Sequence, residues 1–209
     1  MQQNFTDVLP FTQYDPVDEV ALFSQNGTGL GGRFVVLETG NQNPDLTAGT
    51  YVSATPGYNY PYVTDLRYEA PRKFKLAPSG SLKLNVLGLT LYGTAEYDQN
   101  GQKLILNPYR KAELGVVYSG EVSNVLTDGI IRLKSSAYSG IPTPGNVAVV
   151  SSVGDGTLQL FNAATIVANT AASSGSLAWP TLSHVVAKCI STSGTSTFAS
   201  YADFKLVLK

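Results

Sequence analysis

Groups that build covalent or metal-dependent sites are scarce in this 209-residue chain. It contains one cysteine, Cys189, and one histidine, His184. A single cysteine cannot form an internal disulfide, and one cysteine with one histidine cannot complete a Cys/His zinc site. The composition therefore excludes a disulfide-stabilised scaffold and a Cys/His zinc site, and we expect no metal and no cofactor.

Charge and long apolar runs are also sparse. Charged residues make up 14% of the chain, and 15 acidic against 14 basic residues give a net charge of −1. Average globular proteins carry about 25% charge, and phosphate binding needs a clear excess of Lys and Arg. No window approaches the roughly 18 apolar residues of a membrane span, and the N-terminus lacks the pattern of a signal peptide. We therefore expect no nucleic-acid partner, no membrane partner, and synthesis in a cytosol-like compartment.

The chain is instead rich in residues typical of short strands and tight turns, with 19 Ser, 19 Thr, 20 Gly and 12 Tyr. Short runs of Val, Leu, Ile, Thr and Tyr recur every 8–12 residues or so between turn signals, which is typical of β-sandwiches and β-barrels. The sequence therefore predicts an all-β fold with at most one short helix, near residues 162–169. The predicted strands are 33–38, 49–53, 81–91, 94–98, 103–106, 114–118, 130–134, 147–153, 157–161, 185–191 and 203–208.

Two hairpins are expected from their turn residues. Asn100-Gly101 is the pair that most easily adopts positive φ at both turn positions, so it should join strands 94–98 and 103–106. Gly154-Asp155-Gly156 lies at the centre of residues 149–160 and should form a second tight reversal.

Composition divides the chain into three regions: 1–30, 31–111 and 112–209. Residues 1–30 hold four acidic residues, no basic residue and no clear strand pattern. We predict an extended arm whose aromatic side chains, including Phe5, Phe11 and Tyr14, dock on the chain's own body or on a neighbour. The glycine-rich stretch 27–33 is predicted to be a flexible joint between this arm and a first β domain, 31–111. Residues 112–209 are predicted to form a second β region with its own set of strands.

Catalytic patterns are weak. A Ser–His–Asp hydrolase would depend on His184, which the sequence places beside an apolar strand as a surface or hydrogen-bonded residue. Glu96 and Asp98 share one side of a predicted strand, as a glycosidase pair could, but they run into the Asn100-Gly101 turn, where solvated charges are ordinary. We expect no enzyme.

Residues 58–62 and 67–75 form an aromatic and basic cluster, which is the clearest candidate binding surface. Tyrosine and arginine dominate the hot spots of protein interfaces, and this cluster complements the acidic arm in charge, so one copy's arm could cross residues 67–75 of the next. Tyrosines can also stack on sugars or bases, and a plain packing role stays open. With the arm aromatics, the predicted partner-binding residues are Phe5, Phe11, Tyr14, Tyr58, Tyr60, Tyr62, Arg67, Tyr68, Arg72 and Lys73.

The C-terminal half carries a recognisable succession of motifs. Leu-Gly-Val-Val-Tyr-Ser-Gly-Glu-Val at 114–122 precedes Leu-Thr-Asp-Gly-Ile-Ile-Arg-Leu-Lys at 126–134. Pro-Gly-Asn-Val-Ala-Val-Val at 144–150, Gly-Asp-Gly-Thr-Leu at 154–158 and a closing Phe-Lys-Leu-Val-Leu at 204–208 follow. In this order, residues 112–209 resemble the small β-barrel of tailed-bacteriophage capsid decoration (cement) proteins.

The resemblance implies a virion structural protein made in the host cytoplasm. Its partner would be the major capsid protein, bound at subunit junctions on the outer capsid surface, and the chain would form a homo-oligomer, with a trimer favoured. No catalytic residue belongs to that role. The alternative is a carbohydrate- or receptor-binding module of a head fibre or tail, which would use Tyr58, Tyr60, Tyr62 and Trp179 as stacking faces.

Overall fold

The computed structural model describes residues 7–13, 19–23, 29–37, 74–118, 121–171, 179–192 and 201–208. Strands dominate these residues, so the all-β prediction is confirmed. The strands run β1 Val8–Gln13, β2 Glu19–Phe23, β3 Phe34–Leu37, β4 Phe74–Leu76, β5 Val86–Thr90, β6 Gly93–Thr94, β7 Val116–Val117, β8 Val122–Leu126, β9 Ile130–Lys134, β10 Tyr138–Ser139, β11 Val147–Val150, β12 Leu158–Phe161, β13 Val185–Thr192 and β14 Tyr201–Leu206.

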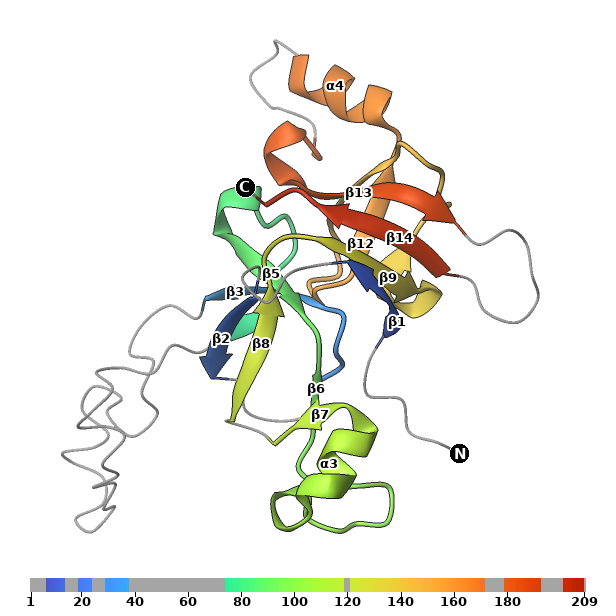
Figure 1. The fold of residues 1–209 in the computed structure, drawn as a ribbon. Coiled ribbons are helices and arrows are strands. Elements are labelled where there is room, and N and C mark those ends of the chain that lie inside the picture. Colours follow the sequence, from blue (N-terminus) through green and yellow to red (C-terminus); the bar gives the residue numbers. More distant parts are fainter. Residues whose placement is uncertain are drawn as a thin grey trace, which may run out of the picture.

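The larger sheet has seven strands in the order β1-β9-β14-β13-β11-β12-β10 and curls over the core (Figure 1). Its pairs are antiparallel except for β10 with β12. In β9, Ile131 and Leu133 are fully buried, whereas Arg132 between them is half-exposed. This period of two places one face of the sheet on the core and leaves the other face to solvent.

The second sheet has five strands in the order β2-β8-β5-β3-β4. The main core lies between the two sheets and includes Phe34 and Leu89 from the smaller sheet with Phe204 from the larger one. Strand β8, from beyond residue 111, pairs with both β2 and β5. The three-part division of the chain stays a prediction, although the sheets and the core draw on residues from either side of its boundaries.

The N-terminal region contains two strands that we did not predict. Strand β1 pairs with β9, and β2 pairs with β8. The expectation of an arm without strand pattern was therefore wrong for residues 8–13 and 19–23, and this part docks on the chain's own body. In β1 the strand pattern is hard to recognise in the sequence because it contains Pro10. Proline lacks an N–H and interrupts the ladder, and the pairing of β1 with β9 shifts register between Leu9 and Thr12.

The predicted joint was also wrong for its described residues, 29–33. Gly29 exchanges two backbone hydrogen bonds with Thr94, at 2.8 and 2.9 Å. The carbonyl of Gly31 accepts a hydrogen bond from the N–H of Asp7, and Gly32 is buried against that residue. These residues are a packed crossing between the sheets rather than a free hinge.

Two α-helices occur among the described residues. Helix α4, Ala163–Ala171, confirms the predicted short helix, but α3, Pro108–Leu114, was not predicted. Its boundaries follow known signals: the Asn107 side chain accepts a hydrogen bond from the N–H of Arg110, proline stands in the first turn, and Gly115 ends the helix at φ 61°. The sequence predicts strands 103–106 and 114–118 and no element between them, so this helix is a correction to that prediction.

The two expected hairpins differ in outcome. Residues 154–156 connect β11 to β12, which pair from Val147↔Phe161 to Val150↔Leu158, so this hairpin is confirmed. At Asn100-Gly101 the chain does reverse, because the Asp98 carboxylate accepts hydrogen bonds from the N–H groups of Asn100 and Gln102, both at 2.8 Å. The flanking strands were wrong: residues 104–106 form a 3₁₀ turn, η4 (Leu104–Leu106), and a single bridge joins Tyr97 to Lys103.

The other predicted strands have partial or full counterparts. Residues 130–134 match β9 in full, and 33–38, 147–153, 157–161, 185–191 and 203–208 overlap β3, β11, β12, β13 and β14. Residues 81–91 divide into η3 (Lys83–Asn85) and β5, and 94–98 and 114–118 shrink to the two-residue strands β6 and β7. The predicted strand 49–53 lies outside the described residues.

Candidate protein-binding surface

Residues 93–118 form a projection that extends from the two sheets on the side opposite α4 (Figure 1). It consists of β6, η4, α3 and β7. A small core of its own, made of Ala95, Leu104 and Val116, is closed by Leu114 and Tyr118. The projection is therefore a packed unit with a backbone of defined shape.

Backbone and ionic contacts fix this projection further. Strands β6 and β7 are parallel, and the N–H of Ala95 donates to the carbonyl of Val117 at 3.1 Å. The Lys111 ammonium lies 2.6 Å from the Glu121 carboxylate, whose second contact is the N–H of Tyr118 at 2.8 Å. Exposed ion pairs contribute little energy singly, but these contacts connect α3 to the start of β8 and restrict its orientation.

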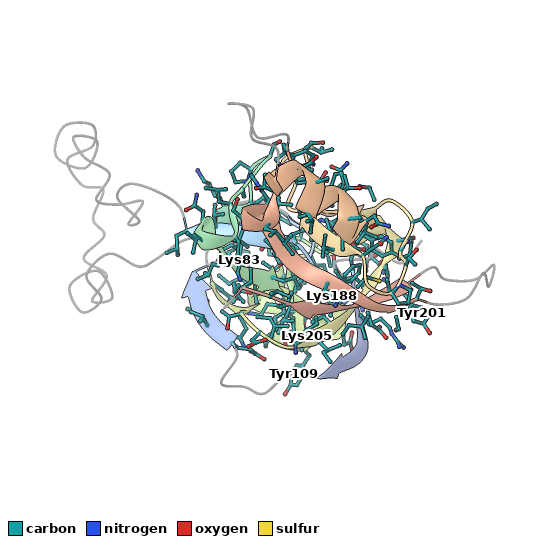
Figure 2. All side chains as sticks on the ribbon, turned by 90° about the horizontal axis from the view of Figure 1, so that it is seen from above. Lys83, Tyr109, Lys188, Tyr201 and Lys205 are labelled. Atoms are coloured by element: carbon teal, nitrogen blue, oxygen red, sulfur yellow. The ribbon has the colours of Figure 1, made fainter. Side chains whose placement is uncertain are left out.

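The outer end of the projection is apolar. Ile105, Leu106 and Tyr109 are 54%, 81% and 85% exposed, and we call them the apolar tip. They come from η4 and the first turn of α3, which follow each other in the chain and are in contact. Figure 2 shows Tyr109 at the margin of the molecule. Neighbouring large apolar side chains exposed to water can mark contact sites for other proteins, so the tip is a candidate contact surface.

None of the sequence-predicted binding residues is one of the three residues of the apolar tip. Phe11 lies in β1, which pairs with β9, and the structure describes its backbone only. The others lie outside the described residues, so the structure does not test whether they come together: Phe5, Tyr14, Tyr58, Tyr60, Tyr62, Arg67, Tyr68, Arg72 and Lys73. Sequence reasoning missed the apolar tip, although Leu-Ile-Leu-Asn-Pro-Tyr at 104–109 combines an apolar run with a helix start and does not alternate as a strand would.

One of the two acidic residues considered for catalysis, Asp98, has a structural role. Asp98 is buried and holds the turn at 98–102. Among the described residues, no group of three His, Cys, Asp or Glu side chains is placed to hold a metal ion. That the chain is not an enzyme stays a prediction.

His184 caps a short 3₁₀ turn, η6 (Leu182–His184). Its Nδ1 accepts a hydrogen bond from the N–H of Thr181 at 3.2 Å and lies 2.8 Å from the Thr181 hydroxyl. This is the hydrogen-bonded histidine that the sequence favoured over a catalytic base. Burial lowers the pKa of His184 below its ordinary value of 6.5.

The lowered pKa of His184 gives a pH dependence of stability. The folded chain binds this proton less readily than the unfolded chain, so the stabilisation is complete above about pH 6.5 and is lost as the pH falls through the lowered value. We expect the free energy of unfolding to decrease from about pH 7 to pH 5, and H184Q to flatten that decrease, in urea titrations. Equal slopes for the two proteins would contradict the assignment, because no other histidine is present.

Trp179 is 37% exposed and packs edge-on against Phe161, with ring centroids 5.6 Å apart. Part of the indole is therefore in contact with β12. The three tyrosines that would complete a sugar-stacking face lie outside the described residues.

The comparisons with known proteins give no relative. No family model, no curated protein and no solved structure matches this chain. Within the described residues, no helix has the length and apolar character needed to cross a membrane.

Proposed function

We propose that this protein is a virion structural protein that binds the outer surface of a phage capsid at junctions between major capsid proteins and stabilises the shell. The observation that carries the proposal is the apolar tip, three large side chains exposed to water on a projection with its own core. The motif order of residues 112–209 supports the partner class. The role requires a binding surface and no catalytic group.

Burial of the apolar tip supplies the driving force in this proposal. Removing apolar surface from water contributes about 25 cal/mol per Å², so three side chains give a modest gain for one copy. A homo-oligomer, with a trimer favoured, would present several tips to a symmetric lattice. Linked contacts of this kind raise the overall affinity by two to four orders of magnitude or so without any new contact.

The proposal predicts that L106S/Y109S loses capsid binding while the fold stays intact. The two side chains are 81% and 85% exposed, so their replacement should change the free energy of unfolding by no more than about 0.5 kcal/mol. Particles from the natural source are isolated on a density gradient, stripped of this protein and offered the recombinant chain. We expect the variant to bind at least about tenfold more weakly.

A matched control separates the tip from general surface hydrophobicity. Ile141 and Val153 are 82% and 77% exposed and lie away from the projection, on the loops before β11 and after it. I141S/V153S should bind like the wild type. Absence of the protein from every particle would overturn the proposed function. Its presence on a fibre or tail in cryo-electron microscopy would favour the receptor-binding alternative.

A further inference from the structure

The solvent face of the larger sheet carries two lysines directly opposite each other. In the register of β13 and β14, Lys188 pairs with Lys205, and both side chains are exposed. Figure 2 shows both on these two strands near the middle of the sheet. Residues opposite each other on antiparallel strands have Cβ atoms about 4.5–5.5 Å apart and point to the same face. The two lysine side chains therefore start close together on the same solvent-exposed face of the sheet.

This pairing is unfavourable for the isolated chain. Like charges directly opposite each other destabilise a sheet, and neither lysine forms an ion pair with another described residue. An external anion placed between the two ammonium groups would remove the repulsion. Binding of an anion at this patch would therefore be favoured by relief of the repulsion between Lys188 and Lys205.

The carboxylate of Asp203, two residues before Lys205 on β14, cannot serve that purpose. Asp203 accepts two hydrogen bonds from the Arg132 guanidinium, at 2.7 and 3.0 Å, and one from the Ser191 hydroxyl at 2.6 Å. The hydrogen bonds from Arg132 lower the pKa of Asp203, so it stays ionised and committed. Arg132 also lies over the Tyr201 ring at 4.1 Å, which holds this neighbouring group in place.

The residues beside the lysines indicate the kind of anion. Across the sheet, Lys188 is opposite Val147 of β11, and Lys205 is opposite Ile130 of β9. Both apolar side chains are half-buried. The row Val147–Lys188–Lys205–Ile130, which we call the lysine row, therefore presents two cations between two apolar groups. Carboxylates on short apolar stems fit such a row, whereas a nucleic acid requires a longer track of cations along its phosphates.

We propose that the lysine row is a second binding surface, which receives clustered Asp or Glu side chains of a protein partner. It lies on β9, β11, β13 and β14, whereas the apolar tip lies on η4 and α3, so the two surfaces are separate. The inference does not depend on the proposed capsid role, because it requires only a partner with adjacent carboxylates.

The test uses the full chain and a fluorescein-labelled hexaglutamate peptide at low salt, followed by fluorescence anisotropy. We expect salt-dependent binding by the wild type and a loss of about tenfold or more in K188Q/K205Q. The matched control is K83Q/K103Q, which removes the same charge from other elements and should bind within about twofold of the wild type. No binding by the wild type, or equal loss in both variants, would overturn the proposal.

Two further measurements distinguish the alternatives. An oligothymidylate of equal charge that binds more tightly than the peptide would assign the row to nucleic acid and contradict the proposal. Thermal unfolding tests the repulsion itself: K188Q should raise the Tm by about 1–3 °C, because one of two facing charges is removed. A lowered Tm would mean that Lys188 stabilises the fold, which is incompatible with the proposed cost.

Discussion

Replacing Gly88 by alanine is expected to destabilise the protein by at least about 3 kcal/mol, or to prevent folding. Gly88 lies in β5, in the middle of the five-stranded sheet. A Cβ at this position would stand 2.2 Å from the carbonyl oxygen of Leu126 and 2.8 Å from Cγ1 of Val125. Both atoms belong to β8, and the nearer one is backbone, so neither a rotamer change nor a small shift relieves the clash. Urea unfolding of G88A measures the cost.

Two other glycine-to-alanine variants serve as controls, because they change the backbone freedom without the steric clash expected at Gly88. A Cβ at Gly29 meets nothing within 4 Å, and Gly29 has no positive φ, so G29A should be nearly neutral. Gly145 also faces open space but has φ +95°, so G145A should cost about 1–2 kcal/mol from backbone strain alone. If G88A cost no more than G145A, the close approach of β5 and β8 would not be a constraint on the sequence.

The strands predicted most accurately lie where one face is buried and the other is polar. Strand β9 alternates Ile131 and Leu133 in the core with Arg132 outside, and its predicted bounds match the structure. The hairpin within residues 147–161 was also predicted, although strand 147–153 was three residues too long. Its turn contains Gly154 and Gly156, which have positive φ and mark the reversal between two apolar runs. In these segments the local pattern and the tertiary environment agree, so the sequence carries enough information.

Prediction failed where tertiary contacts decide the conformation. Strands β1 and β2 form because the edges of β9 and β8 offer unpaired backbone groups, and their own residues show no clean alternation. Residues 104–106 contain three apolar side chains in a row, which we assigned to a strand. They form a turn because only Leu104 reaches the small core of the projection, while the cap at Asn107 starts a helix.

The candidate surface was harder to predict than the fold. The sequence drew attention to tyrosines and arginines, which are frequent in interfaces, but composition does not say which apolar residues stay exposed. Leu104 and Leu106 differ by two positions in one turn, yet Leu104 is buried and Leu106 is 81% exposed. That difference depends on the packing of α3 against η4, which no local pattern encodes.

The other large effect is expected at the ion pair that attaches the N-terminal strand. The Asp7 carboxylate lies 2.8 Å from Nη1 of Arg33, and their side chains are only 7% and 9% exposed. Asp7 also accepts a hydrogen bond from the Ser136 hydroxyl at 2.6 Å, and its backbone carbonyl accepts one from the N–H of Lys134 at 2.9 Å. Asp7 therefore joins three segments that are distant in sequence: the start of β1, the crossing before β3 and the end of β9.

Removing Asp7 would leave the buried Arg33 guanidinium without its ion-pair partner. Only the longer-range attraction of the Asp155 carboxylate would remain, and the surroundings cannot supply the water that a free cation needs. We expect D7A to cost about 3–5 kcal/mol in urea unfolding, the amount typical of breaking a buried pair from one side. Replacing both partners by neutral groups costs less than leaving one charge behind, so D7A/R33M should be more stable than D7A.

The double variant also decides between a buried pair and mere packing. If packing of Asp7 alone mattered, adding R33M to D7A would lower stability further; if the stranded charge matters, R33M restores part of the loss. Limited proteolysis adds a spatial readout, because β1 held by this pair should be cleaved early in D7A and late in the double variant. A cost below about 1 kcal/mol for D7A would instead be typical of a solvent-screened pair. The acidic N-terminal region would then be held by its strand pairing with β9 and β8, without help from its charge.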